Sequence, residues 1–127
     1  VVADAAVACG GKHIGILPRF MEHLKYPSLT ELVWTDTMSE RKDKMLEGTC
    51  GIVALPGGIG TMDELFEAHV LKKLGKYDGR LFVLNIDGFY DPLKALLERF
   101  VETNMTSKED VELVEFCDSV EELVTKI

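Results

Sequence analysis

The chain has 127 residues and a mass of 14.2 kDa, which suits a single domain and leaves too little length for two independent hydrophobic cores. Apolar residues make up 46% of it and charged residues 28%, a composition typical of globular proteins and unlike that of disordered ones. The 14 basic and 22 acidic residues give a net charge of −8, which repels phosphate backbones and anionic membranes. Nucleic acid is therefore not expected as a partner.

Neither a membrane span nor a metal site is indicated by the sequence. The longest apolar runs are about half a dozen residues, far below the ~20 that a spanning helix needs. Cys9, Cys50 and Cys117 are odd in number and widely spaced, without a CxxC or Cys/His cluster that could hold a metal. These cysteines predict a reduced, cytoplasmic setting. The chain begins without Met, inside an alanine-rich helical pattern at residues 1–9 that has no capping residue ahead of it, which predicts a truncated or processed N-terminus.

Short apolar runs alternate with segments of helical periodicity along the whole chain. This alternation predicts an α/β fold, in which crossover helices join the strands of a parallel sheet and cover both of its faces. Segments 52–55 and 81–84 are apolar without alternation, as central parallel strands are, so both are expected in the middle of the sheet. The predicted strands are residues 13–17, 31–35, 51–55, 80–86 and 111–117.

The clearest helix follows the third predicted strand. Thr61-x-x-Glu64 has the pattern of a capping box, Lys72 and Lys73 suit the last turn, and Gly75 suits the C-cap. Other helices have similar starting signals. They are Thr37-x-x-Glu40, opening a helix to about residue 47, Asp91-Pro92, opening a helix with apolar residues at 93, 96, 97 and 100, and Ser119-x-x-Glu122, opening a terminal helix with Val120, Leu123 and Val124 inward.

A glycine-rich segment, Pro-Gly-Gly-Ile-Gly-Thr at residues 56–61, lies between that strand and that helix. Open parallel sheets bind ligands at such junctions, where Gly57, Gly58 and Gly60 would let backbone amides and the positive end of the helix dipole approach a phosphate. The pattern is neither GxGxxG nor a Walker motif with its lysine, which argues against a dehydrogenase or an ATPase. The alternative is a tight turn in which the glycines serve geometry alone.

Glu64 has two interpretations that the spacing leaves open. As a capping-box residue it would fold back onto the start of its own helix. As a functional residue it would place a carboxylate beside the anion site, where it can orient or deprotonate a hydroxyl or water, and Asp63 can share that task. His69, further along the same helix, is expected to pack rather than to act as a base.

A second candidate feature is the cationic stripe at residues 38–42. Met38 and Met45 are seven residues apart and define one side of a helix, and Arg41 and Lys42 lie between them at positions where a structural helix would carry Leu or Ile. Two inward cations indicate a bound anion. The alternative is a rotated stripe in which Arg41 pairs with acids on the surface.

These motifs resemble those of one known family. Residues 56–64, PGGIGTMDE, match the PGGxGTxxE signature of the Lonely Guy (LOG) family, long described as lysine decarboxylase-like. Residues 38–42 resemble its MxxRK segment, and residues 84–90, LNIDGFY, are similar to its LLNxDGYY strand end. The resemblance covers essentially all 127 residues and implies that the family's first strand and an earlier glycine-rich segment precede residue 1. The chain would then be about the C-terminal two thirds of one LOG-type domain.

The resemblance implies a Rossmann-like fold, a homodimer, and a phosphoribohydrolase that needs neither metal nor cofactor. Such an enzyme cleaves the N-glycosidic bond of purine or cytokinin nucleoside 5′-monophosphates, including AMP, to free base and ribose 5-phosphate. Ser39 stands where plant members tend to have His, and Asp63 where many members have Glu. By motif position, Glu64 and Arg41 would be catalytic, Gly57, Gly58, Gly60 and Thr61 would hold the phosphate, and Lys42, Met38 and Asp63 would line the site.

The chemistry of that reaction suits the implied residues. Breaking the C1′–N bond passes through an oxocarbenium-like state, which a carboxylate such as Glu64 stabilises. Arg41 would hold the ribose and phosphate or polarise the departing base, and we expect it to converge with Glu64 on one pocket. A nucleotide-binding module without turnover would carry the same motifs and is the alternative. Pyridoxal-dependent decarboxylation is rejected, because no motif supplies a Schiff-base lysine and a cofactor cradle.

Overall fold

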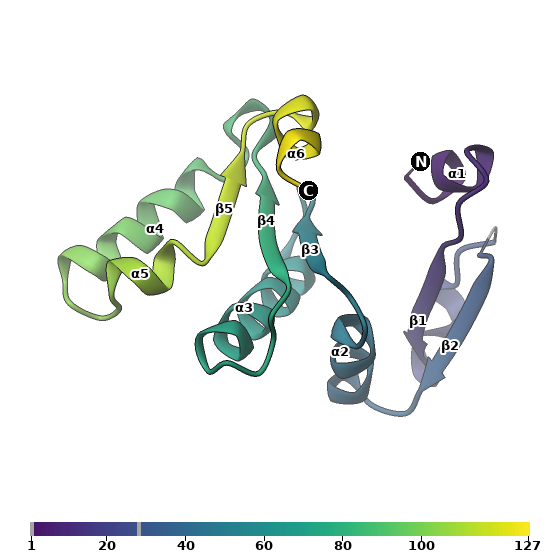
Figure 1. Ribbon diagram of the computed structural model, residues 1–127. Coiled ribbons are helices and arrows are strands. Elements are labelled where there is room, and N and C mark those ends of the chain that lie inside the picture. Colours follow the sequence, from purple (N-terminus) through teal and green to yellow (C-terminus); the bar gives the residue numbers. More distant parts are fainter. Residues whose placement is uncertain (1, 28) are drawn as a thin grey trace. The chain divides into compact units, whose positions relative to one another are not determined.

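The computed structural model describes residues 2–27 and 29–127 (Figure 1). It divides into two compact units, Val1–Glu47 and Gly48–Ile127. The predicted α/β class is confirmed, because the strands of both units are parallel and helices surround them. Within the described ranges, no helix is long and apolar enough to cross a membrane. The single-domain assignment stays a prediction, and the first residue of the expected helix at 1–9 lies outside the described residues.

The first unit holds a two-stranded parallel sheet in which Ile14 lies opposite Glu31 and Pro18 opposite Thr35. Its last helix begins at the predicted capping box, since the hydroxyl of Thr37 accepts the backbone N–H of Glu40 at 3.0 Å. In chain order, the elements are α1 (Val2–Ala8), β1 (Ile14–Pro18), the 3-10 helix η1 (Arg19–Leu24), β2 (Glu31–Thr35) and α2 (Met38–Leu46).

The second unit holds a three-stranded parallel sheet in the order β3-β4-β5 (Figure 1). In chain order, its elements are β3 (Gly51–Ala54), α3 (Ile59–Lys73), β4 (Arg80–Leu84), the 3-10 helix η2 (Ile86–Gly88), α4 (Asp91–Glu102), α5 (Lys108–Val111), β5 (Val114–Cys117) and α6 (Val120–Lys126). Each predicted strand is present with bounds that shift by at most a few residues, whereas η1, η2 and α5 were not predicted. The short 3-10 turns lack the periodicity on which sequence prediction depends.

The prediction of two central strands is half right. β4 lies between two neighbours, and Leu81 and Val83 on it are almost fully buried. β3, however, forms the edge of this three-stranded sheet, and Val53 and Leu55 are 37% and 41% exposed. An apolar run reports how well the two faces of a strand suit burial, but it carries no information about how many strands pair with it.

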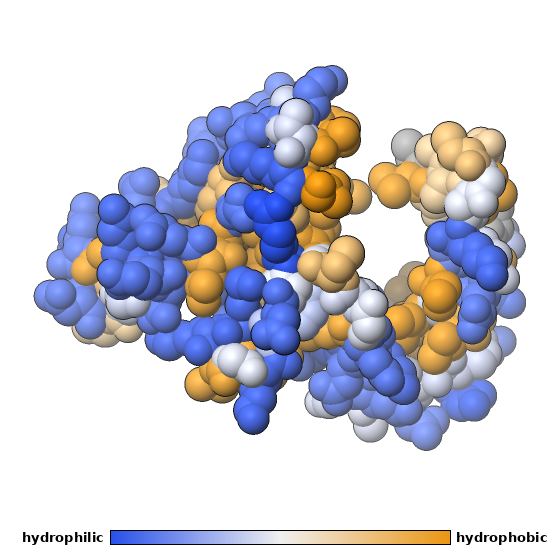
Figure 2. Space-filling model, in the orientation of Figure 1, coloured by the Kyte–Doolittle hydropathy of each residue, from blue (hydrophilic) through white to orange (hydrophobic). Residues whose placement is uncertain are grey.

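Helix α6 packs through a narrower side than predicted. Leu123 is buried, but Val120 and Val124 are 49% and 64% exposed, so the expectation that all three point inward is wrong. Hydrophobic surface over α6 is visible in Figure 2. A helix of seven residues makes only two turns, and α6 meets β4 and β5 through one line of contact.

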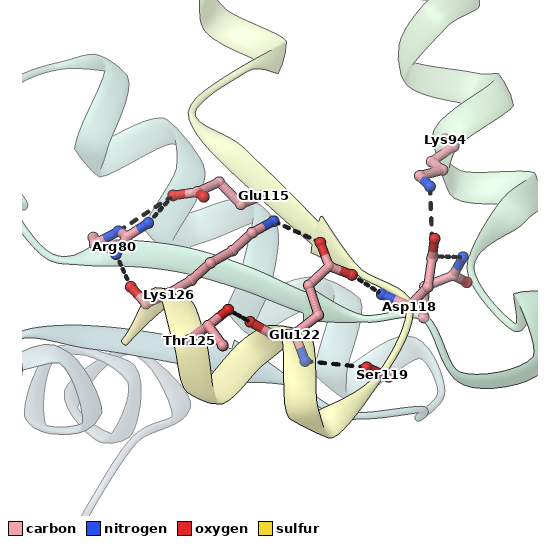
Figure 3. A network of polar contacts seen from close by, with 9 residues as sticks. Arg80, Lys94, Glu115, Asp118, Ser119, Glu122, Thr125 and Lys126 are labelled. Atoms are coloured by element: carbon pink, nitrogen blue, oxygen red, sulfur yellow. Dashed lines mark hydrogen bonds and ion pairs between the residues drawn. The ribbon is translucent and has the colours of Figure 1, made fainter.

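Polar contacts fasten α6 to the sheet (Figure 3). Arg80 of β4 pairs with Glu115 of β5 at 2.7 Å and also donates to the backbone carbonyl of Lys126. The ammonium of Lys126 lies 2.7 Å from the carboxylate of Glu122, whose other oxygen accepts the backbone N–H of Asp118 at 2.8 Å. At the predicted box Ser119-x-x-Glu122, the hydroxyl of Ser119 accepts the N–H of Glu122 at 3.1 Å, while the Glu122 carboxylate reaches the residue before the N-cap.

Candidate functional site

The glycine-rich segment and the β4–α4 connection meet at one edge of the second sheet. β3 and β4 are parallel neighbours, with Gly51 opposite Arg80 and Ala54 opposite Val83. The segments that follow these two strands therefore leave the sheet at the same end. Residues 55–58 follow the carboxyl end of β3, and residues 85–90 follow that of β4. Ligands of open parallel sheets bind at this end of the strands.

Helix α3 begins two residues before the predicted capping box. Its N-cap is Gly58, in an extended conformation, and the N–H of Met62 already donates to the carbonyl of Gly58 at 3.2 Å. Thr61 is thus the third helical residue and Glu64 the sixth, so the prediction that these two form a capping box is wrong. Of the two interpretations of Glu64, the capping one is excluded by the register of the helix.

The start of α3 is left without any negative group of its own. Within the described parts of the chain, no side chain caps it, and its first turn holds no acidic residue. The N–H groups of Ile59, Gly60 and Thr61 precede the first possible intrahelical acceptor and point out of the end of the helix. Together with the positive end of the dipole of a 15-residue helix, these amides form a site suited to an anion.

The three glycines differ in what surrounds them. None of them is among the residues with positive φ, so none is required by its backbone conformation. At Gly57 a Cβ would collide with the side chain of Thr61, whose own Cβ would lie only 3.0 Å away. At Gly58 and Gly60, a Cβ would meet nothing within 4 Å. Packing therefore explains Gly57, and the role of Gly58 and Gly60 in holding a phosphate stays a prediction.

Glu64 lies one helical turn beyond Gly60, on the same side of α3. Glu64 is half-buried, and side chains of an α-helix lean in general toward its N-terminus, so its position on the helix is compatible with the predicted role beside the helix start. The neighbouring Asp63 is exposed and faces a different direction, into a groove of about 540 Å³ along α3. The groove is lined by Ile59, Met62, Asp63, Phe66, Glu67, Val70 and Leu71.

The cationic stripe of the first unit lies on the inward side of α2. Arg41, Lys42 and Met45 are half-buried, whereas Met38 is 37% exposed at the start of the helix. The Nε of Arg41 donates to the backbone carbonyl of Ile16 in β1 at 3.1 Å. This hydrogen bond anchors the arginine to the sheet of the first unit, as an inward orientation requires, and the bound anion stays a prediction.

The predicted site residues therefore fall into two groups. Six of them gather around the start of α3 in the second unit: Gly57, Gly58, Gly60, Thr61, Asp63 and Glu64. The other three, Met38, Arg41 and Lys42, lie on α2 in the first unit. The convergence of Arg41 with Glu64 on one pocket stays a prediction.

Two further residues refine the site. His69 packs α3 against α5, because its Nε2 lies 2.6 Å from the backbone carbonyl of Asp110, as expected of a packing residue. Tyr90 was missed by sequence reasoning, although its hydroxyl donates to the carbonyl of Leu55 at the entrance to the glycine-rich segment at 2.6 Å. A signal for it was present, since Asn85 directly after an apolar strand and the following Asp-Gly pair mark a structured turn at the ligand edge.

Parallel strands surrounded by helices, with a glycine-rich helix start at the carboxyl ends of the strands, define a Rossmann-like α/β protein. The family model described as "Possible lysine decarboxylase" matches residues 1–127. The chain belongs to this family, which includes the LOG proteins.

Curated relatives carry a common name. A "Cytokinin riboside 5'-monophosphate phosphoribohydrolase" of Mycobacterium tuberculosis is 37% identical over 123 residues, covering 95% of this chain and 66% of the relative. The protein of the same name called LOG3 in Arabidopsis thaliana is 34% identical over 129 residues, covering 99% of this chain and 60% of the relative. A "Probable cytokinin riboside 5'-monophosphate phosphoribohydrolase LOGL2" of Oryza sativa subsp. japonica is 30% identical, covering 99% and 53%. The chain spans between about half and two thirds of the length of these relatives.

Proposed function

We propose that the protein containing this chain hydrolyses the N-glycosidic bond of purine or cytokinin nucleoside 5′-monophosphates, releasing free base and ribose 5-phosphate. The observation that carries the proposal is the uncapped start of α3, with the carboxylate of Glu64 one turn along the same side of the helix. The names of the relatives support the same substrate class.

In this proposal the amides of residues 59–61 and the hydroxyl of Thr61 hold the 5′-phosphate. The carboxylate of Glu64 then faces the ribose and stabilises the positive charge that develops as the C1′–N bond breaks. The same carboxylate positions a water molecule, whose oxygen bonds to C1′ as the C1′–N bond breaks, and the proton that the water loses balances the one that the departing base gains. No step in this sequence needs a redox change or a covalent intermediate.

Arg41 and Lys42 supply the second half of the proposed site. Arg41 is held against β1 by its hydrogen bond to the carbonyl of Ile16, and we propose that its guanidinium binds the ribose and phosphate or the base. Lys42 and Met38 would line the edge of the same site.

We also propose a cytoplasmic homodimer. Its cytoplasmic location is supported by the free thiols of Cys9, Cys50 and Cys117. Its assembly is supported by the outer side of α3, where Ile59 and Val70 are 89% and 54% exposed next to the groove described above. Sedimentation of the full-length protein tests the dimer, and a monomer at micromolar concentration would contradict it.

The experiment that tests the activity uses the full-length protein with AMP and with isopentenyladenosine monophosphate. Chromatography should show the free base and ribose 5-phosphate, and Glu64→Ala should abolish both. Glu121→Ala on the exposed side of α6 is the control and should retain turnover. Unchanged turnover in Glu64→Ala would refute the assignment. Stabilisation by AMP on heating, without release of base over hours, would instead identify a nucleotide-binding module.

A further inference from the structure

The hydroxyl of Tyr90 holds the chain just before Pro56. It donates to the backbone carbonyl of Leu55 at 2.6 Å. Burial raises the pKa of the Tyr90 phenol, while the nearby backbone of Gly57 lowers it, which places Gly57 beside the same hydroxyl. One buried side chain of the β4–α4 connection thereby fixes the point at which the chain leaves β3 and enters the glycine-rich segment.

Tyr90 is itself held by a well-connected turn. The side-chain oxygen of Asn85 accepts the backbone N–H of Tyr90 at 2.6 Å, and its amide donates to Asp91 at 2.9 Å and to Asp118 at 3.0 Å. Asn85 is only 3% exposed and Tyr90 only 4%. Gly88 closes the turn with φ of +70°, a conformation that favours glycine. The tyrosine is thus in a place determined by β4, α4 and the loop after β5.

We infer that Tyr90 is a positioning residue for the phosphate site, an inference that rests on the proposed function. Leu55, which accepts the bond from Tyr90, lies three residues before Gly58, the N-cap of α3. An anion site built from amides works only when those amides are held within about 0.5 Å of the productive geometry. Tyr90 touches the backbone of the loop and acts on the phosphate through it.

A matched control exists in the same unit. Tyr77 is also buried, at 9% exposure, and its hydroxyl lies 2.9 Å from the hydroxyl of Thr49, but it precedes β4 and so belongs to the opposite end of the strands. Tyr90→Phe and Tyr77→Phe each remove one buried phenolic hydroxyl. Both variants lose similar thermal stability if the hydroxyls serve only the fold, so stability alone does not separate the two roles.

The discriminating measurement is calorimetric binding of AMP and of adenosine to the full-length protein and both variants. Tyr90→Phe should weaken AMP binding about tenfold, as expected for the loss of a buried hydrogen bond, and should leave adenosine binding within about twofold. Tyr77→Phe should change neither affinity. Amide hydrogen exchange at Gly57 and Gly58 without ligand should become faster in Tyr90→Phe alone.

The outcomes distinguish this inference from the proposed function. Wild-type protein that binds AMP no more tightly than adenosine would overturn the phosphate site and the inference together. A wild type that prefers AMP, with Tyr90→Phe equal to it, would overturn the inference alone. Equal weakening of AMP and adenosine by Tyr90→Phe would also overturn it, because a displaced phosphate loop affects only the phosphorylated ligand.

Discussion

Two helix starts in the same unit look alike in sequence and differ in structure. Ser119-x-x-Glu122 and Thr61-x-x-Glu64 both fit the capping-box pattern. At α6 the box forms, because the hydroxyl of Ser119 accepts the N–H of Glu122 and the carboxylate of Glu122 accepts the N–H of Asp118. At α3 the helix has already begun at Ile59, and the pattern falls inside it.

The difference lies in how each helix start satisfies its backbone amides. The start of α6 is satisfied by its own side chains, as are the starts of α2 and α5, where Thr37 and Ser107 accept backbone N–H groups. The start of α3 has a glycine N-cap and no acid in its first turn. A helix start that is closed by its own side chains gains stability, and in our proposal the open start of α3 is kept for the phosphate of a ligand.

The largest expected effect is on kcat, and it distinguishes Glu64 from Glu122. Glu64→Gln should lower kcat for AMP by about 10²–10³-fold, because it removes the charge that stabilises the transition state. Glu122→Gln should leave kcat unchanged and lower the stability of α6 instead. Steady-state kinetics of the full-length protein, with thermal unfolding of both variants, checks this. Equal kcat losses in the two variants would show that activity is lost through unfolding and not through the removal of a catalytic charge.

A smaller effect is expected at Gly57. Gly57→Ala should reduce the free energy of unfolding by about 1–3 kcal/mol, because the new methyl group meets the Thr61 side chain. Thr61→Ala in the same chain removes Oγ1, the closest atom, but keeps the Cβ at 3.0 Å, so the double variant should regain part of the loss. Urea unfolding of the two single variants and the double variant measures this coupling. Additive losses would mean that the collision is not the cause.

Sequence reasoning captured the parts of the fold that follow local rules. The strands, the parallel pairing and the capping boxes at residues 37 and 119 depend on apolar runs and on the hydrogen-bonding of short polar side chains. It misplaced the start of α3, because Gly58 and Gly60 lower helix propensity without preventing helix formation in the context of the fold.

Long-range relations could not be read from one chain. The edge position of β3 depends on which strands pair, and the hydrogen bond from Tyr90 to Leu55 joins residues that are 35 apart in sequence. Motif spacing nevertheless gathered Gly57, Gly58, Gly60, Thr61 and Glu64 at one helix start, because that set is local. The pairing of Arg41 with Glu64 is not local, which is why it remains a prediction.

Gly58→Asp would give α3 the cap that it lacks. The N-cap is extended, with φ of −97° and ψ of −151°, so aspartate fits there without backbone strain. Its carboxylate should take the free amides, raising stability without ligand by a few tenths of a kcal/mol and weakening AMP binding at least about tenfold. Gly58→Ala is the control for the added Cβ. We expect Gly58→Asp to raise the free energy of unfolding and to lower the affinity for AMP. A decrease of both would contradict this expectation.

The smallest expected effect is the pH dependence of the stability that Glu122 contributes at the N-terminus of α6. Hydrogen bonds from Lys126 and from the backbone of Asp118 hold the pKa of Glu122 below its usual 4.5. A lowered pKa in the folded state means that the stabilisation is complete above pH 4.5 and is lost as the pH falls through the lowered value. Urea unfolding should therefore show a stability gap between wild type and Glu122→Gln at pH 7 that narrows below pH 4.5. Because Glu122 raises the pKa of Lys126, the corresponding gap for Lys126→Met should be complete between pH 4.5 and 10.5, narrow as the pH rises through the raised value, and narrow also at low pH, where Glu122 loses its charge. A gap for Glu122→Gln that is the same at pH 3 and pH 7 would mean that the carboxylate charge contributes nothing to the cap.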